Sequence, residues 1–283
     1  MVFDPRRCEL GEGPLWHPVR GQLYWFDITG QRLMSRDATG ALEWQMGECV
    51  SAAGWIDRDR LLIASETALF QFDLTDGTRR DICALEADQL ETRSNDGRAD
   101  PWGGFWIGTM GKQSEPGLGA IYRFYRGELR TLFAPMSIPN AISFTPDRRF
   151  ACFTGDLDGK VMRVALGRDG WPDGPPEVFL DLADEGLDPD GAVFDASGNL
   201  WLAEWGAARV ACYGPDGKFV RAVAFAAPHT SCPSFGGPDL STLFCTSALQ
   251  DMSAAERAAS PEAGMVFEAA GVTRGLPEYQ VVL

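Results

Sequence analysis

A segment type that recurs about six times along the chain constrains the fold more than any other feature. Each copy combines a short stretch of mixed apolar and polar residues, a turn built on Pro, Asp, Gly or Arg, and an apolar strand. The six apolar strands are residues 23–25, 61–63, 105–107, 150–153, 200–202 and 243–245. The period is roughly 40 to 50 residues, which is typical of propeller blades.

Further strands complete each unit. Alternating apolar and polar stretches follow most copies, and pairs such as Asp158-Gly159 and Asp216-Gly217 separate them. Sequential antiparallel strands in six similar units predict an all-β fold, a six-bladed β-propeller formed by a single domain over residues 1–283. An array of β-sandwiches explains less well why the units are so alike. Residues 251–259 show the one weak helical pattern, which indicates a short helix or loop.

A propeller must also close. An open ring leaves two unpaired strand edges, so a strand from one terminus is expected to complete the blade begun at the other. Either Val2-Phe3 or residues 279–282 could supply this strand.

Composition excludes several classes of protein. The 283 residues are 45% hydrophobic, enough for a large core, and carry a formal net charge of -15, which argues against nucleic acid or an anionic membrane as partner. The seven cysteines are irregularly spaced and form no CxxC pair. There is no apolar signal core and no apolar run of membrane-spanning length. We therefore expect a reduced, soluble, cytoplasmic protein.

One register position stands out when the copies are aligned. It holds Glu12, Ala52, Asn95, Asn140, Asp190 and Cys232. The first strand of each blade lines the central channel, so residues in matching register would form a ring around one mouth of it. The four polar members each lie six residues before the Pro or Ala of their motif. We call these six positions the ring.

The polar ring residues suit a metal ion. Two carboxylates and an amide oxygen are hard ligands for Ca²⁺, Mg²⁺ or Mn²⁺, and Zn²⁺ or Fe²⁺ also accept them. The sequence thus predicts a metal site in the central channel. For any single residue, a hydrogen bond to a turn backbone is the alternative. A Gly follows Glu12, Asn95 and Asp190 within two residues, which would permit either a tight turn or the close approach of a ligand.

Arg93 is the second element of the predicted site. It lies two residues from Asn95, so both side chains would point the same way along a strand. Its fork of donors could hold a carbonyl or a hydroxyl of a polyol. The alternative is a surface salt bridge to Asp96 or Asp100.

At these residues the chain resembles the senescence-marker-protein/gluconolactonase family, which includes regucalcin and bacterial sugar lactonases. The resemblance covers almost the full length, and it depends on the order and spacing of short motifs. These motifs are residues 8–16, 93–97 with Asp100-Pro101, 105–110, 139–142, 188–192, 198–201 and 230–237.

The resemblance implies one divalent metal, held by Glu12, Asn140 and Asp190, and substrate contacts from Arg93 and Asn95. The family often places a substrate-binding Glu shortly after its Gly-Thr-Met motif. Here Gln113 and, two residues later, Glu115 occupy the corresponding stretch, so both are candidates. Family members are often monomeric, which nothing in this chain contradicts.

The expected activity is hydrolysis of a sugar lactone to its aldonic acid, with a divalent cation (Ca²⁺, Zn²⁺, Mn²⁺, Mg²⁺ or Fe²⁺) as cofactor and Asp190 as the catalytic base. Two alternatives remain open at this point. One is an organophosphate or aryl ester hydrolase on the same scaffold, and the other is a non-enzymatic calcium-binding protein.

Overall fold

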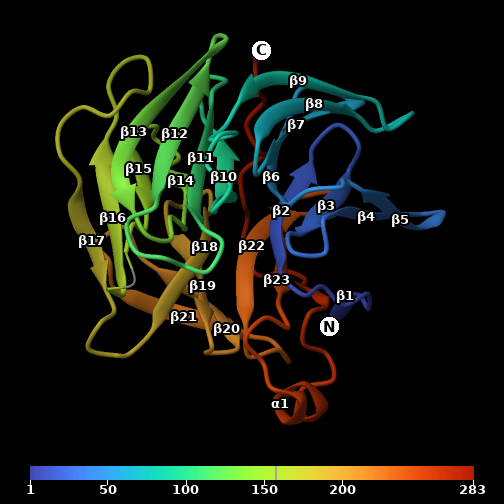
Figure 1. The fold of residues 1–283 in the computed structure, drawn as a ribbon. Helices are drawn as coiled ribbons and strands as arrows, with labels where there is room; N and C mark the ends of the chain where they lie inside the picture. Colours follow the sequence, from blue (N-terminus) through green and yellow to red (C-terminus); the bar gives the residue numbers. More distant parts are fainter. Residues whose placement is uncertain (157) are drawn as a thin grey trace.

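Six four-stranded antiparallel sheets surround a central axis in the computed structural model, which describes residues 1–156 and 158–283 (Figure 1). This arrangement confirms the six-bladed β-propeller that the repeat predicts. In each sheet one strand lies nearest the axis, and these innermost strands are β2, β6, β10, β14, β18 and β22 (Figure 1).

Three blades come from the N-terminal half of the chain. From the axis outward, their strands are β2 (Gly11–His17), β3 (Gln22–Asp27), β4 (Arg32–Asp37) and β5 (Gly40–Gln45); β6 (Val50–Trp55), β7 (Arg60–Ser65), β8 (Ala68–Asp73) and β9 (Arg79–Ala84); and β10 (Thr92–Ala99), β11 (Phe105–Gly111), β12 (Gly119–Tyr125) and β13 (Glu128–Met136).

The other three blades follow the same order. Their strands are β14 (Ser143–Phe144), β15 (Phe150–Phe153), β16 (Lys160–Ala165) and β17 (Glu177–Asp181); β18 (Asp188–Phe194), β19 (Leu200–Trp205), β20 (Arg209–Tyr213) and β21 (Phe219–Ala224); and β22 (Thr230–Gly236), β23 (Thr242–Ser247), β24 (Val266–Ala269) and β1 (Val2–Asp4).

The ring is closed by the N-terminus. Strand β1 pairs with β24 as the outer strand of the last blade, so Val2-Phe3 supplies the closing strand and residues 279–282 do not. The predicted short helix forms as α1 (Ala254–Ala259), which begins at the N-cap Ser253 with a capping box to Glu256. No helix in residues 1–156 and 158–283 combines the length and the apolar character needed to cross a bilayer.

The ring positions coincide with irregularities in the innermost strands. The register between each of five innermost strands and its neighbour shifts close to the ring residue, for example between Glu12 and Leu15 in β2 and between Pro189 and Ala192 in β18. Such bulges bend a strand and redirect its side chains. The bulges therefore let the ring side chains leave the sheet and face the channel.

The glycines beside the ring are explained by packing between blades. A Cβ atom on Gly191 would lie 2.3 Å from Sγ of Cys232 in the next blade, and one on Gly13 would lie 2.2 Å from the carbonyl oxygen of Ser51. Gly13 also has a φ of 52°. Innermost strands of neighbouring blades thus approach more closely than a side chain would permit, which adds a third reason for these glycines to the two predicted from sequence.

The C-terminal segment, residues 270–283, contains no strand and lies at the far end of the channel. The Val281 N–H donates to the Trp55 carbonyl at the end of β6, and the Val282 N–H donates to Gly103, beyond the end of β10. Figure 1 shows this red segment passing between β6 and β10 to the C-terminus. The ring lies towards the beginnings of the same strands, so the segment and the ring occupy opposite ends of the channel.

Candidate active site

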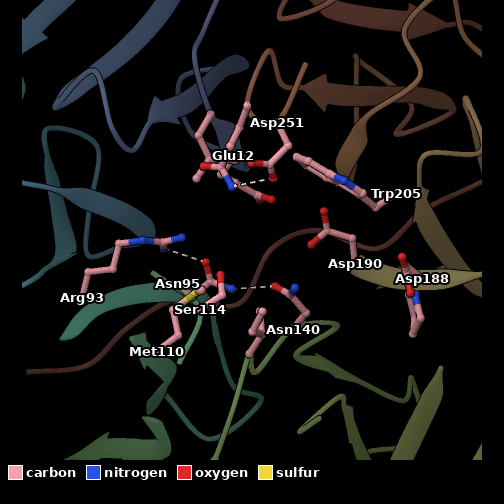
Figure 2. A pocket seen from close by; sticks show the side chains of 14 residues that line it. Glu12, Arg93, Asn95, Met110, Ser114, Asn140, Asp188, Asp190, Trp205 and Asp251 are labelled. Carbon is pink, nitrogen blue, oxygen red and sulfur yellow. Dashed lines mark hydrogen bonds between the residues drawn. The ribbon is translucent and has the colours of Figure 1, made fainter. Parts of the chain in front are cut away.

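Five of the residues named from sequence line one cavity of about 230 Å³ at the ring end of the channel. They are Glu12 from β2, Arg93 and Asn95 from β10, Asn140 from the segment before β14, and Asp190 from β18 (Figure 2). All five are buried, with exposed fractions between 6% for Asp190 and 9% for Asn140. Four blades therefore converge on a single small, polar cavity.

A chain of hydrogen bonds joins three of these side chains. Nη1 of Arg93 donates to Oδ1 of Asn95 at 2.8 Å, and Nδ2 of Asn95 donates to Oδ1 of Asn140 at 2.8 Å (Figure 2). Arg93 can only donate, so the chain fixes both amide orientations. The Asn140 oxygen keeps a second lone pair, which is available to another partner. Arg93 does not form the surface salt bridge considered as its alternative, since it is buried beside Asn95.

The segment that carries Asn140 is held from two sides. Its backbone N–H donates to Oγ1 of Thr154 at 2.9 Å, and the Ile142 N–H donates to Oδ2 of Asp96 at 2.7 Å. Between them Ala141 adopts a φ of 56°, which is unusual for a residue with a Cβ. Backbone of this kind persists only where its surroundings determine it, and such positions cluster at ligand sites.

Glu12 and Asp190 are buried carboxylates without a cationic partner. Neither forms an ion pair with a Lys or Arg of the described residues. Burial, followed by the charge of Asp96, raises the pKa of Glu12 to about 8. Burial and the charge of Glu12 raise the pKa of Asp190 well above its ordinary value. Without a partner, negative charge at this cavity is costly.

These residues fit a divalent cation. Glu12 Oε2 accepts a hydrogen bond from the Gly13 N–H at 3.0 Å, and its other oxygen accepts none from the described residues. Two carboxylates and an amide oxygen are the donors that hard cations prefer, and a cation would relieve the repulsion between the carboxylates. The described residues contain no group of three or more His, Cys, Asp or Glu side chains that could hold a metal. The metal site thus depends on the Glu, Asn and Asp combination and stays a prediction.

Gln113 and Glu115 do not line the cavity. Gln113 is exposed, and Oε2 of Glu115 accepts the Gln113 backbone N–H at 3.0 Å. Ser114, which lies between them with a φ of 61°, lines the cavity instead. Substrate contact by either Gln113 or Glu115 therefore stays a prediction, and it would require the connection between β11 and β12 to rearrange.

Sequence reasoning missed part of the wall. Asp188, Trp205 and Asp251 line the cavity together with Glu12 and Asp190 (Figure 2). Asp188 lies two residues before Asp190, and the alternation of a strand would place both on one face. Trp205 is the last residue of β19, and Asp251 lies in the connection between β23 and α1. Neither occupies the register position that the repeat singled out.

The fold and this cavity define the protein as a β-propeller with a polar pocket at one end of its channel. The chain belongs to the SMP-30/gluconolactonase/LRE-like family, whose model matches residues 10–249. The family that the motifs resemble is thereby confirmed.

Relatives and solved structures extend over nearly the whole chain. A protein of Rhizobium meliloti named as a candidate sugar lactone lactonase is 41% identical, covering 92% of this chain and 89% of its own. The L-arabinolactonase of Azospirillum brasilense is 36% identical, covering 95% and 90%. The crystal structure of a calcium-binding protein, regucalcin, from Agrobacterium tumefaciens has a TM-score of 0.97 and 37% identity, covering 100% of this chain and 97% of that one.

Proposed function

We propose that this protein is a divalent-metal-dependent hydrolase that opens a sugar lactone to the aldonic acid. One observation carries the proposal. Two buried carboxylates without a cationic partner, Glu12 and Asp190, line the same small cavity as the hydrogen-bonded series Arg93, Asn95 and Asn140. The names of relatives support the reaction class, because they include an L-arabinolactonase, a 6-deoxy-6-sulfogluconolactonase and a pentonolactonase.

Glu12, Asn140 and Asp190 would hold the cation. When bound, it would supply a Lewis acid for the lactone carbonyl. Asn95 donates to the Asn140 oxygen and so keeps that oxygen turned towards the site. The same series of hydrogen bonds also holds Arg93 at the wall, where its remaining N–H groups would orient lactone oxygens.

Asp190 would act as the base. It would accept a proton from the attacking water as the water oxygen bonds to the lactone carbonyl carbon. The ring C–O bond then breaks, the leaving alkoxide takes up the proton held by Asp190, and the new carboxylic acid ionises at neutral pH. The net change is one lactone and one water converted to one aldonate and one proton, so acid release measures turnover.

The test is acid release from a panel of aldonolactones, with chelator-stripped protein and with Ca²⁺, Mg²⁺, Mn²⁺, Zn²⁺ or Fe²⁺ restored separately. We expect release that requires a metal. Asp190→Asn should lower kcat by roughly 100-fold or more, because it removes both the base and one carboxylate that would hold the cation. Asp184→Asn, an exposed carboxylate outside the cavity, is the matched control and should leave kcat unchanged. Release no faster than the spontaneous rate with every metal would overturn the proposal.

The same preparations separate the alternatives. Turnover of aryl or phosphate esters in the absence of lactone turnover would favour an esterase. Tight Ca²⁺ binding measured by calorimetry, with no turnover of any substrate, would favour a calcium-binding protein, as the Agrobacterium tumefaciens regucalcin is named.

A further inference from the structure

The charges around the cavity are unevenly distributed between its buried end and its rim. Asp188 and Asp251 are exposed carboxylates that line the cavity where it opens, in addition to the buried Glu12 and Asp190. Arg93 is the one cationic side chain among the lining residues. Its Nη1 already donates to the Ser94 carbonyl at 2.9 Å and to Asn95, at the buried end. The rim itself therefore carries only negative charge.

An aromatic side chain forms part of the same wall. Trp205, at the end of β19, is half-buried and stacks on His229, with ring centroids 4.3 Å apart and planes inclined by 14°. His229 does not line the cavity, and its Nδ1 is 2.9 Å from the Gln250 carbonyl oxygen. The stack and this contact hold the indole in place. Figure 2 shows Trp205 beside Asp190, the residue proposed as the base that acts at the lactone carbonyl.

We propose that Trp205 is the platform on which the sugar ring packs, and that Asp188 and Asp251 make the site selective for uncharged sugar lactones. Lactones that carry a phosphate, sulfonate or second carboxylate would be rejected. This inference rests on the proposed function and names its substrate class.

The size and polarity of the cavity determine how a substrate would lie. At about 230 Å³ the cavity falls below the range of about 300–1,000 Å³ used by drug-sized ligands, which suits a single monosaccharide. The lactone carbonyl would point to the buried end, where Glu12, Asn140 and Asp190 gather. The other end of the sugar then reaches the rim, and its C–H groups can pack on the negative face of the indole.

The rim charges act on whatever the sugar carries at that end. A hydroxyl can donate to a carboxylate, whereas an anionic substituent is repelled by both Asp188 and Asp251. At distances of several ångströms and with partial screening by water, each carboxylate should disfavour an anion by roughly tenfold. The reaction also turns a neutral substrate into an anion. The same rim charges therefore weaken binding of the aldonate product and assist its release.

The first experiment compares two lactones that differ only in charge, glucono-δ-lactone and its 6-phosphate, by the ratio of their kcat/KM values. We expect the wild type to favour the neutral lactone strongly. Asp188→Asn and Asp251→Asn should each shift the ratio towards the phosphorylated lactone by roughly tenfold, and the double variant by roughly 100-fold. Gluconate should inhibit these variants at lower concentration than it inhibits the wild type. Asp184→Asn is again the matched control.

The second experiment tests the platform. Trp205→Ala should raise KM for the neutral lactone by roughly tenfold with little change in kcat, and Trp205→Phe should retain most of the affinity. His229→Ala removes the side chain on which Trp205 stacks but keeps the indole in the cavity wall. It therefore distinguishes the effect of losing the indole from the effect of losing its support. It should raise KM less than Trp205→Ala does. Equal effects of both, or a fall in kcat alone for Trp205→Ala, would contradict a platform.

The outcomes distinguish the two proposals. If no lactone is hydrolysed, the proposed function fails. If the neutral lactone is hydrolysed but the wild type handles its 6-phosphate equally well, or the two Asn variants leave the ratio unchanged, the lactonase function stands and the selectivity of the rim is refuted.

Discussion

His17 is a fully buried histidine whose two ring nitrogens meet groups of opposite hydrogen-bonding character. Its Nε2 is 2.9 Å from the Asp57 carbonyl oxygen, so this nitrogen donates. Its Nδ1 accepts the Arg20 N–H at 3.3 Å. A protonated ring could not accept at Nδ1, and Arg20 and Arg58 lie nearby. Burial, followed by the charges of these arginines, lowers the pKa of His17 below its ordinary 6.5.

Acid should therefore destabilise the protein through His17. Its pKa is lower in the folded chain than in the unfolded chain, so the unfolded chain takes up this proton first. The contribution is complete above about pH 6.5 and is lost as the pH falls below it. Buried acids such as Asp96, whose pKa burial raises to about 6, act in the opposite direction. The measurement is thus a difference between two proteins: urea unfolding of wild type and His17→Gln from pH 8 to pH 5. The wild type should lose more free energy of unfolding than the variant, and parallel profiles would contradict this role.

The site residues that sequence predicts are those fixed by the repeat. Glu12, Asn95, Asn140 and Asp190 share one offset from a turn, and identical blades place identical offsets at the same height around the axis. Trp205 and Asp251 could not be found in this way, because Trp205 ends the second strand of its blade and Asp251 lies in a connection, and neither shares the common offset. The positions of Gln113 and Glu115 were inferred from a family motif, and the turn at Ser114 directs a different side chain into the cavity.

Each innermost strand lines the channel and also packs against the innermost strands of the neighbouring blades. Strand β18 shows how closely these two roles are joined, since Asp190 faces the cavity and Gly191 packs against Cys232 of β22. The alternating pattern in the sequence locates such a strand but cannot show how near the next blade lies. The number of blades and the order of strands could thus be predicted, whereas the reason for this glycine required the structure.

Gly191→Ala should lower the free energy of unfolding and disturb the site together. Its Cβ would lie 2.3 Å from Sγ and 2.8 Å from Cα of Cys232, so β18 must move, at a cost of about 1–3 kcal/mol. The shift also displaces Asp190, and lactone turnover should fall even under conditions where the variant is fully folded. Urea unfolding and kcat are the measurements. Gly167→Ala is the matched control, because its Cβ would have no neighbour nearer than 3.5 Å. If Gly191→Ala were as stable and active as Gly167→Ala, β18 and β22 could move apart without cost, and the close contact at Gly191 would not matter.

The whole molecule is joined across its axis by the C-terminal segment. Glu278 forms a buried ion pair with Arg98 of β10, and Arg98 also donates to the carbonyls of Ile142 and Ala192 at 3.2 Å each. One arginine therefore connects three blades with the chain terminus beneath the cavity. Neither the repeat nor the composition indicated this contact, because Glu278 lies outside every repeated motif and Arg98 could equally have paired on the surface.

Removing one partner of this pair should destabilise the entire propeller. In Glu278→Ala the guanidinium of Arg98 stays buried without its carboxylate, which costs about 3–5 kcal/mol. Arg98 supports carbonyls in two further blades, so we expect one cooperative unfolding transition at lower denaturant concentration and not the loss of a single blade. Urea unfolding followed by both circular dichroism and tryptophan fluorescence measures this. Glu128→Ala, which breaks an exposed pair with Arg130, is the matched control and should leave the midpoint unchanged. If Glu278→Ala also left the midpoint unchanged, water would have to reach Arg98, and the pair with Glu278 would not be needed for the stability of the propeller.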